Sequence, residues 1–226
     1  ELVGAIDFNQ RACDTYKLNF PNSNVICCDI ADKSVNEAKF GQVDIIVGGP
    51  PCQGFSALNR HGKNREDDPR NILFMQFIRF VREIKPKALM IENVRQILTQ
   101  KDGYARKTIC SMLDELGYNV NYKVLNASDF GVPQNRRRAF FVGIRKDIGE
   151  FSFEIIEKYI VKIKTTVDEA LGDLYKIEDK NNCNDKHKYD VNFNSEYLKI
   201  MHDGSGCVEN HFIKYPNMNV QKRIHY

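Results

Sequence analysis

Residues 43–56 read VDIIVGGPPCQGFS, an apolar run followed at once by a turn rich in glycine and proline. The apolar run is typical of a buried strand, and the glycines and prolines predict a sharp, rigid turn directly after it. Cys52 is therefore expected just past the carboxyl end of a strand, the edge of an open α/β sheet where ligands bind. We interpret Cys52 as a reactive thiol, with a packing thiol as the alternative.

Two further segments place polar side chains at strand ends. The apolar run 88–94 contains Glu92 near its end, and the stretch 133–138, PQNRRR, leads directly into the apolar run 139–144. Neighbouring parallel strands would bring Cys52 and Glu92 to the same edge. In extended backbone Arg136 and Arg138 point the same way and Arg137 points oppositely. The plain alternatives are a strand-end salt bridge for Glu92 and a solvated or DNA-facing patch for the arginines.

Strands and helices alternate along most of the chain, which predicts an α/β fold: a mostly parallel sheet with helices on both faces. The helix at 10–19 is expected to be capped by Asn9, with Ala12, Tyr16 and Phe20 facing inward. Residues 166–171 resemble a short capped helix, and residues 178–190 a polar surface loop or disordered segment. Strands are expected at 2–6, 25–28, 43–47, 88–92, 118–125 and 139–144, and further helices at 72–84 and 105–116, the latter stopped by Gly117.

Composition limits the function classes. The chain has 226 residues, 42% hydrophobic and 28% charged, and a net charge of +3 that is too small to indicate nucleic acid by itself. Its seven cysteines are odd in number and lack C-x-x-C spacing, which argues against a disulfide framework or a zinc site, and no metal is expected. No apolar run reaches membrane-spanning length. We expect a cytoplasmic protein without a signal peptide, and a fragment, because no initiating Met is present.

Taken together, the three segments resemble the DNA cytosine-5 methyltransferases. The matching elements are Pro51 with Cys52, the Glu-Asn-Val run 92–94, and the Gln-x-Arg-x-Arg run 134–138. The resemblance covers residues 1–145 and implies a Rossmann-like fold that binds S-adenosylmethionine. It implies a catalytic domain over 1–150, incomplete at its N-terminus, and the start of a variable, partly irregular target-recognition region over 151–226.

The family's activity is methyl transfer to carbon 5 of a cytosine flipped out of double-stranded DNA. The resemblance implies that Cys52 adds to carbon 6 of the ring and that Glu92 holds nitrogen 3 and the exocyclic amine. Arg136 and Arg138 would bind oxygen 2 and orient the loop that carries Cys52. The residues implied for S-adenosylmethionine are Asp7, Phe8, Asp29, Ile30, Pro50 and Leu73. Without the resemblance, Asp7 and Asp29 could equally be helix caps.

The basic loop 53–70 is expected to close on DNA as a lid, with an ordinary exposed loop as the alternative. The expected DNA contacts are Ser56, Arg60, Lys63, Arg65 and Gln134. We expect a monomer, associated with the nucleoid through DNA and paired genetically with a restriction endonuclease.

Three alternative functions are compatible with the sequence. One is an RNA (tRNA) cytosine-5 methyltransferase that uses the same pocket. A second is a non-catalytic DNA-binding remnant, favoured for the fragment because the family's glycine-rich cofactor turn before the position of Glu1 and its last C-terminal motif are not found. The weakest is a dehydrogenase, because the chain lacks G-x-G-x-x-G.

Overall fold

The computed structural model describes residues 1–32, 35, 37–51, 72–175, 177, 186–190, 192–193, 195–202 and 204–209. The chain divides into two compact units. Unit 1 comprises residues 1–126 and 136–159, and unit 2 comprises residues 127–135 and 160–226. Cys52 and the loop 53–70 lie outside the described residues. The assignment of 1–150 to a catalytic domain and of 151–226 to a target-recognition region stays a prediction.

Unit 1 begins with a parallel strand pair, β1 (Gly4–Asp7) and β2 (Asn24–Cys27), joined by helix α1 (Gln10–Asn19). The predicted cap is confirmed, because the Asn9 side chain accepts hydrogen bonds from the backbone of Arg11 and Ala12. The expected inward face is wrong for Ala12 and Phe20, which are exposed, whereas Tyr16 is half-buried. The buried residue of α1 is Cys13, and its thiol lies 3.4 Å from the carbonyl oxygen of Asp7.

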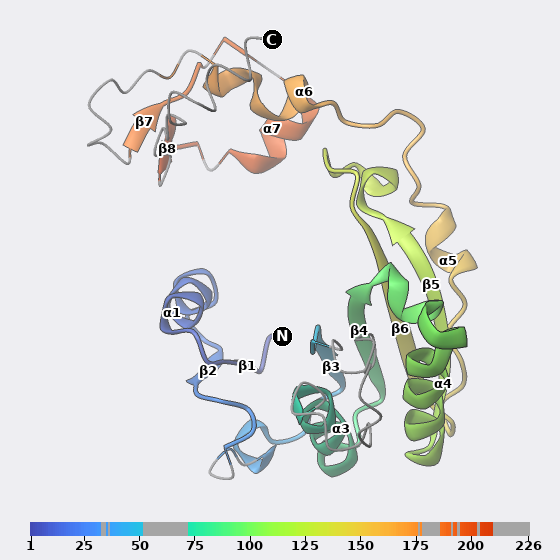
Figure 1. The fold of residues 1–226 in the computed structure, drawn as a ribbon. Coiled ribbons are helices and arrows are strands. Elements are labelled where there is room, and N and C mark those ends of the chain that lie inside the picture. Colours follow the sequence, from blue (N-terminus) through green and yellow to red (C-terminus); the bar gives the residue numbers. More distant parts are fainter. Residues whose placement is uncertain are drawn as a thin grey trace, which may run out of the picture. The chain divides into compact units, whose positions relative to one another are not determined.

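The larger sheet of unit 1 has the strand order β3–β4–β6–β5, shown in Figure 1. Its strands are β3 (Ile45–Gly48), β4 (Ala88–Val94), β5 (Tyr118–Asn126) and β6 (Arg137–Arg145). Strand β3 pairs parallel to β4, and β6 runs antiparallel to both of its neighbours. Strands β3, β4 and β5 thus share one direction and β6 opposes them, so the predicted α/β fold is confirmed and this sheet is mixed rather than mostly parallel in its pairings.

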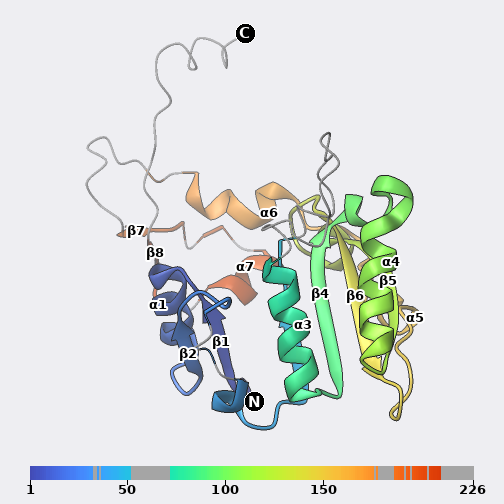
Figure 2. The same ribbon diagram turned by 60° about the horizontal axis from the view of Figure 1, so that its bottom comes forward.

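The main hydrophobic core lies between this sheet and helices α3 (Ile72–Ile84) and α4 (Gln100–Glu115), which share one face (Figure 2). From α3 the core takes Phe74, Phe77, Ile78 and Val81, a spacing typical of an amphipathic helix. The span of α4 includes three residues, 101–103, with positive φ and non-helical backbone, so its regular part begins after Gly103, close to the expected Ala105. The short 3-10 helix Arg95–Leu98 links β4 to it.

The opposite face of the sheet is covered near β5 by the segment 149–157, which contains helix α5 (Glu154–Glu157) (Figure 1). The Asn119 side chain donates to the carbonyl oxygen of Gly149, and Lys123 forms an ion pair with Glu157. On the same face, Ile45 and Val47 of β3 remain more than half exposed.

Unit 2 contains helix α6 (Val167–Leu171), the 3-10 turn Gly172–Leu174, helix α7 (Glu196–Met201), and strands β7 (Lys186–Lys188) and β8 (Cys207–Glu209). The predicted capped helix at 166–171 is confirmed by a capping box between Thr166 and Glu169. The expectation of a loop through residue 190 is wrong at 186–188, because this stretch pairs antiparallel with β8. No described helix is long and apolar enough to cross a membrane.

Candidate active site

The site is built where β3 and β4 end side by side. Gly48, the last residue of β3, pairs with Ile91, so Glu92 stands one position beyond the last pair. Gly48 must be glycine, because a Cβ there would lie 2.8 Å from a ring carbon of Phe77. A Cβ on Gly49 would instead lie 3.6 Å from Oε2 of Glu92, an ordinary contact distance. The turn that leads to Cys52 therefore leaves β3 directly beside the carboxylate of Glu92.

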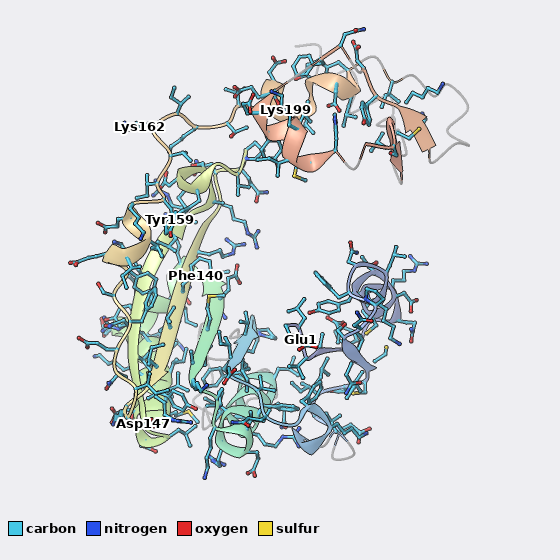
Figure 3. The ribbon with its side chains drawn as sticks, turned by 180° about the vertical axis from the view of Figure 1, so that it is seen from behind. Glu1, Phe140, Asp147, Tyr159, Lys162 and Lys199 are labelled. Atoms are coloured by element: carbon cyan, nitrogen blue, oxygen red, sulfur yellow. The ribbon has the colours of Figure 1, made fainter. Side chains whose placement is uncertain are left out.

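Two arginines from the start of β6 meet the carboxylate of Glu92. Glu92 lies directly opposite Phe140, which Figure 3 labels on β6, and Arg138 is two residues before Phe140 on the same face. The Nε of Arg138 is 3.1 Å, and the Nη2 of Arg136 3.7 Å, from Oε1 of Glu92. The structure thus brings together three of the residues singled out in the sequence. The salt bridge that was the plain alternative for Glu92 is also present.

The geometry leaves part of this cluster available to a ligand. Both arginines contact Oε1 of Glu92, and Oε2 accepts no hydrogen bond from the described residues. The side chains of Glu92 and Arg136 are 36% and 48% exposed. One carboxylate with two guanidinium groups leaves a net positive charge. The cluster can accept one hydrogen bond from a ligand N–H and donate others to a ligand oxygen.

The residues expected to hold a cofactor gather at the carboxyl ends of β1 and β2. Asp7 ends β1 opposite Cys27, and Asp29 follows Cys27 by two residues. One oxygen of each carboxylate accepts a backbone N–H two residues ahead, from Asn9 and from Ala31, at 2.8 Å. These are local turn contacts and not the helix caps that were the alternative, because α1 is capped by Asn9 and no described helix begins directly after Asp29. The second oxygen of each accepts no hydrogen bond from the described part of the chain.

Other groups at this edge are an exposed ring and a half-buried aliphatic side chain. The ring of Phe8 is 79% exposed, and Ile30 is half-buried. Arg79 of α3 fixes the position of Ile30, because its Nη2 donates to the Ile30 carbonyl oxygen at 3.0 Å. Sequence reasoning missed Arg79, since a basic residue in an amphipathic helix pattern is normally solvent-facing. Leu73 lies half-buried near the start of the same helix.

The described structure of unit 1 does not contain the five residues expected to contact DNA. Ser56, Arg60, Lys63 and Arg65 lie outside the described residues. Gln134 belongs to unit 2, where its backbone N–H donates to the carbonyl oxygen of Val132. Within the described ranges, no three His, Cys, Asp or Glu side chains are grouped to hold a metal ion.

Comparison with known proteins identifies the family. The model of the C-5 cytosine-specific DNA methylase family matches residues 1–225. The chain belongs to this family. It is 43% identical over 153 residues to the type II methyltransferase M1.HphI of Haemophilus parahaemolyticus, an alignment covering 66% of the chain and 41% of that protein. It is 38% identical over 214 residues to M.DdeI of Desulfomicrobium norvegicum, covering 92% of the chain and 51% of that methyltransferase.

Solved structures of methyltransferases are similar to the chain. A putative DNA modification methyltransferase encoded within an E. coli prophage has a TM-score of 0.64 and 31% identity, covering 83% of this chain and 52% of that chain. The Dnmt2 methyltransferase of S. pombe, at 24% identity, shares the fold with a TM-score of 0.59 and coverage of 79% and 55%. The chain therefore spans about half the length of several of its relatives.

Proposed function

We propose that this C-5 methylase transfers a methyl group from S-adenosylmethionine to carbon 5 of cytosine in double-stranded DNA. The observation that carries the proposal is the cluster of Glu92, Arg136 and Arg138 beside the turn that leads to Cys52. Its free acceptor and its guanidinium donors match the donor and acceptor edge of a cytosine. A base inside the duplex cannot reach such a cluster, so the base is flipped out before reaction.

In the proposed mechanism, the thiolate of Cys52 adds to carbon 6 of the ring, and carbon 5 becomes nucleophilic. Oε2 of Glu92 accepts a hydrogen bond from the exocyclic amine or from protonated nitrogen 3, which lowers the cost of the addition. Arg138 and Arg136 donate to oxygen 2 and hold the carboxylate in place. After carbon 5 has gained the methyl group it loses its proton to a base, and the bond to sulfur breaks to restore the ring.

S-adenosylmethionine supplies the methyl group as an electrophile when it is bound. The residues at the ends of β1 and β2 fit this cofactor. The free oxygens of Asp7 and Asp29 can accept hydrogen bonds from ribose hydroxyls and from the adenine amine, and the ring of Phe8 is exposed for stacking. Ile30, Pro50 and Leu73 would add apolar contacts.

The finer parts of the proposal concern partners and location. The loop residues Ser56, Arg60, Lys63 and Arg65, together with Gln134, are proposed to contact the DNA backbone. The protein is proposed to act as a monomer in the cytoplasm, at the nucleoid. M1.HphI and M.DdeI are named type II methyltransferases, and a cognate restriction endonuclease is the proposed genetic partner.

The test is covalent trapping. The intact protein is incubated with S-adenosylmethionine and duplex DNA that contains 5-fluorocytosine, from which carbon 5 has no proton to lose. We expect a stable adduct that peptide mapping locates at position 52, and none with Cys52→Ala. The absence of an adduct, or unchanged turnover of Cys52→Ala, would overturn the proposal. If a matched tRNA is methylated in preference to DNA, the substrate of the enzyme is RNA and not DNA.

A further inference from the structure

We propose that Asn93 is a positioning residue that holds the turn leading to Cys52 against the strand that carries Glu92. The proposal rests on the function proposed above and adds a residue to it. Its basis is a hydrogen bond of 2.9 Å from Nδ2 of Asn93 to the carbonyl oxygen of Pro50, two residues before Cys52.

The backbone of the turn can take only a limited part in this connection. The parallel register pairs Ile45 with Ala88 and continues to Gly48 with Ile91. Continued for two more residues, it would place Pro50 opposite Asn93. Pro50 and Pro51 have no backbone N–H, so they cannot donate to β4, and only their carbonyl oxygens can accept. The side-chain amide of Asn93 donates to the carbonyl oxygen of Pro50 and attaches the turn to β4 beyond the end of β3.

Both ends of the Asn93 amide are in use. Its Oδ1 accepts a hydrogen bond from the backbone N–H of Val94 at 2.9 Å, and the residue is only 8% exposed. This pair of partners fixes which end of the amide is the donor. An aspartate at position 93 would keep the acceptor for Val94 but would turn a second acceptor toward the Pro50 carbonyl, where a donor is required.

The placement on β4 links the two halves of the proposed chemistry. Successive side chains of a strand point to opposite faces, so Glu92 faces the arginine cluster and Asn93 faces the core side with Ile91. One residue would hold the base and the next would hold the loop of the nucleophile. A shift of the loop relative to Glu92 would separate the thiolate from carbon 6, and small displacements of reacting groups reduce rates strongly.

The decisive variant is Asn93→Asp, with Asn119→Asp as its matched control. Asn119 also lies in the sheet and donates its amide to a backbone carbonyl, that of Gly149, at 2.8 Å, but it is placed outside the proposed machinery. The readouts are the rate of adduct formation with the 5-fluorocytosine duplex, the DNA dissociation constant and the melting temperature. We expect Asn93→Asp to slow adduct formation at least tenfold with unchanged DNA affinity, and Asn119→Asp to react at the wild-type rate.

The outcomes separate the two proposals. If the wild-type protein forms no adduct at position 52, the proposed function fails and the role of Asn93 falls with it. If the wild type reacts and Asn93→Asp reacts equally fast, only the positioning role is overturned. A general structural role would show as equal losses of melting temperature and rate in both variants, and this result also overturns the proposal. If Asn93→Asp does not fold, Asn93→Ser replaces it, and a wild-type adduct rate in that variant overturns the role.

Discussion

Two carboxylates, one in each unit, are paired with nitrogen groups in opposite ways. Glu92 in unit 1 meets Arg138 and Arg136 while its side chain stays 36% exposed. Asp173 in unit 2 meets His202, with Nε2 of the ring 2.9 Å from Oδ2, and its side chain is 3% exposed. The exposed cluster can exchange its partners for a ligand, whereas the buried pair cannot without losing the interaction that compensates its burial. The difference separates a group suited to chemistry from one suited to folding.

The surroundings of Asp173 support a structural role. The ring of His202 stacks on Tyr189 at a centroid distance of 4.0 Å, and the hydroxyl of Tyr189 accepts a hydrogen bond from the backbone N–H of Gly206. The backbone oxygen of Asp173 accepts from the N–H of Asp190. The pair therefore connects the 3-10 turn after α6, the end of α7 and the chain next to β7 and β8.

The largest expected effect is on catalysis, from Glu92→Gln. This change keeps the shape of the side chain but removes the charge that assists proton chemistry on the base, a contribution of about 100- to 10,000-fold. We expect the rate of methyl transfer by the intact protein to decrease by this factor. The rate is measured as incorporation of labelled methyl groups into duplex DNA. The free energy of unfolding should change by less than about 1 kcal/mol, because exposed ion pairs stabilise little.

Glu157→Gln is the control for this prediction. Glu157 is also a partly exposed carboxylate of unit 1 in an ion pair, but its partner is Lys123 of β5, two strands away from Glu92, and neither contacts the cluster. It should retain full activity. If both variants lose activity alike, or if Glu92→Gln remains fully active, Glu92 does not have the proposed role.

The second effect is on stability, from His202→Ala. The change leaves the buried carboxylate of Asp173 without its partner, which costs about 3 kcal/mol when a buried pair is broken from one side. Hydrogen exchange of the backbone amides of α6 and α7 is the measurement, and these should exchange faster. Lys199→Ala, which removes an exposed partner of Glu196 in the same helix, should stay within about 0.5 kcal/mol of the wild type. If the amides of α6 and α7 are equally protected from exchange in His202→Ala and Lys199→Ala, the buried pair does not stabilise unit 2 as expected.

Local sequence signals predicted much of unit 1. The apolar periodicity of α3 and the cap at Asn9 follow from neighbours in sequence. The meeting of Glu92 with Arg138 depends instead on β6 running antiparallel to β4, which brings the start of β6 to the carboxyl end of β4. The antiparallel placement of β6 between β4 and β5 could not be derived in this way, because strand direction depends on pairings far along the chain.

The errors have similar physical causes. The sequence did not predict the positive φ of Lys101 and Asp102 before the regular part of α4, a conformation that residues other than glycine rarely adopt. The strand at 186–188 forms only because residues 207–209 pair with it. The contact of Arg79 with Ile30 joins residues 49 positions apart, and its only sequence signal was a basic residue within an otherwise apolar helix.

The smallest expected effect concerns the capping box of α6. The backbone N–H and hydroxyl of Thr166 both donate to Oε2 of Glu169, and these hydrogen bonds lower the pKa of that carboxyl. Because the folded pKa lies below the unfolded one, the stabilisation is present above the unfolded pKa and is lost as the pH falls through the folded pKa. Thr166→Ala removes the hydroxyl and should cost about 1 kcal/mol near neutral pH.

The difference in unfolding free energy between the wild type and Thr166→Ala should become smaller in acid, because both proteins then carry a protonated Glu169. Urea unfolding at neutral and at acidic pH measures it, with Thr165→Ala as the control, since the hydroxyl of Thr165 donates to the carbonyl oxygen of Gly131 and not to a titrating group. The loss of unfolding free energy caused by Thr165→Ala should not depend on pH. A cost of Thr166→Ala that is equally independent of pH would mean that Glu169 is not held by the cap.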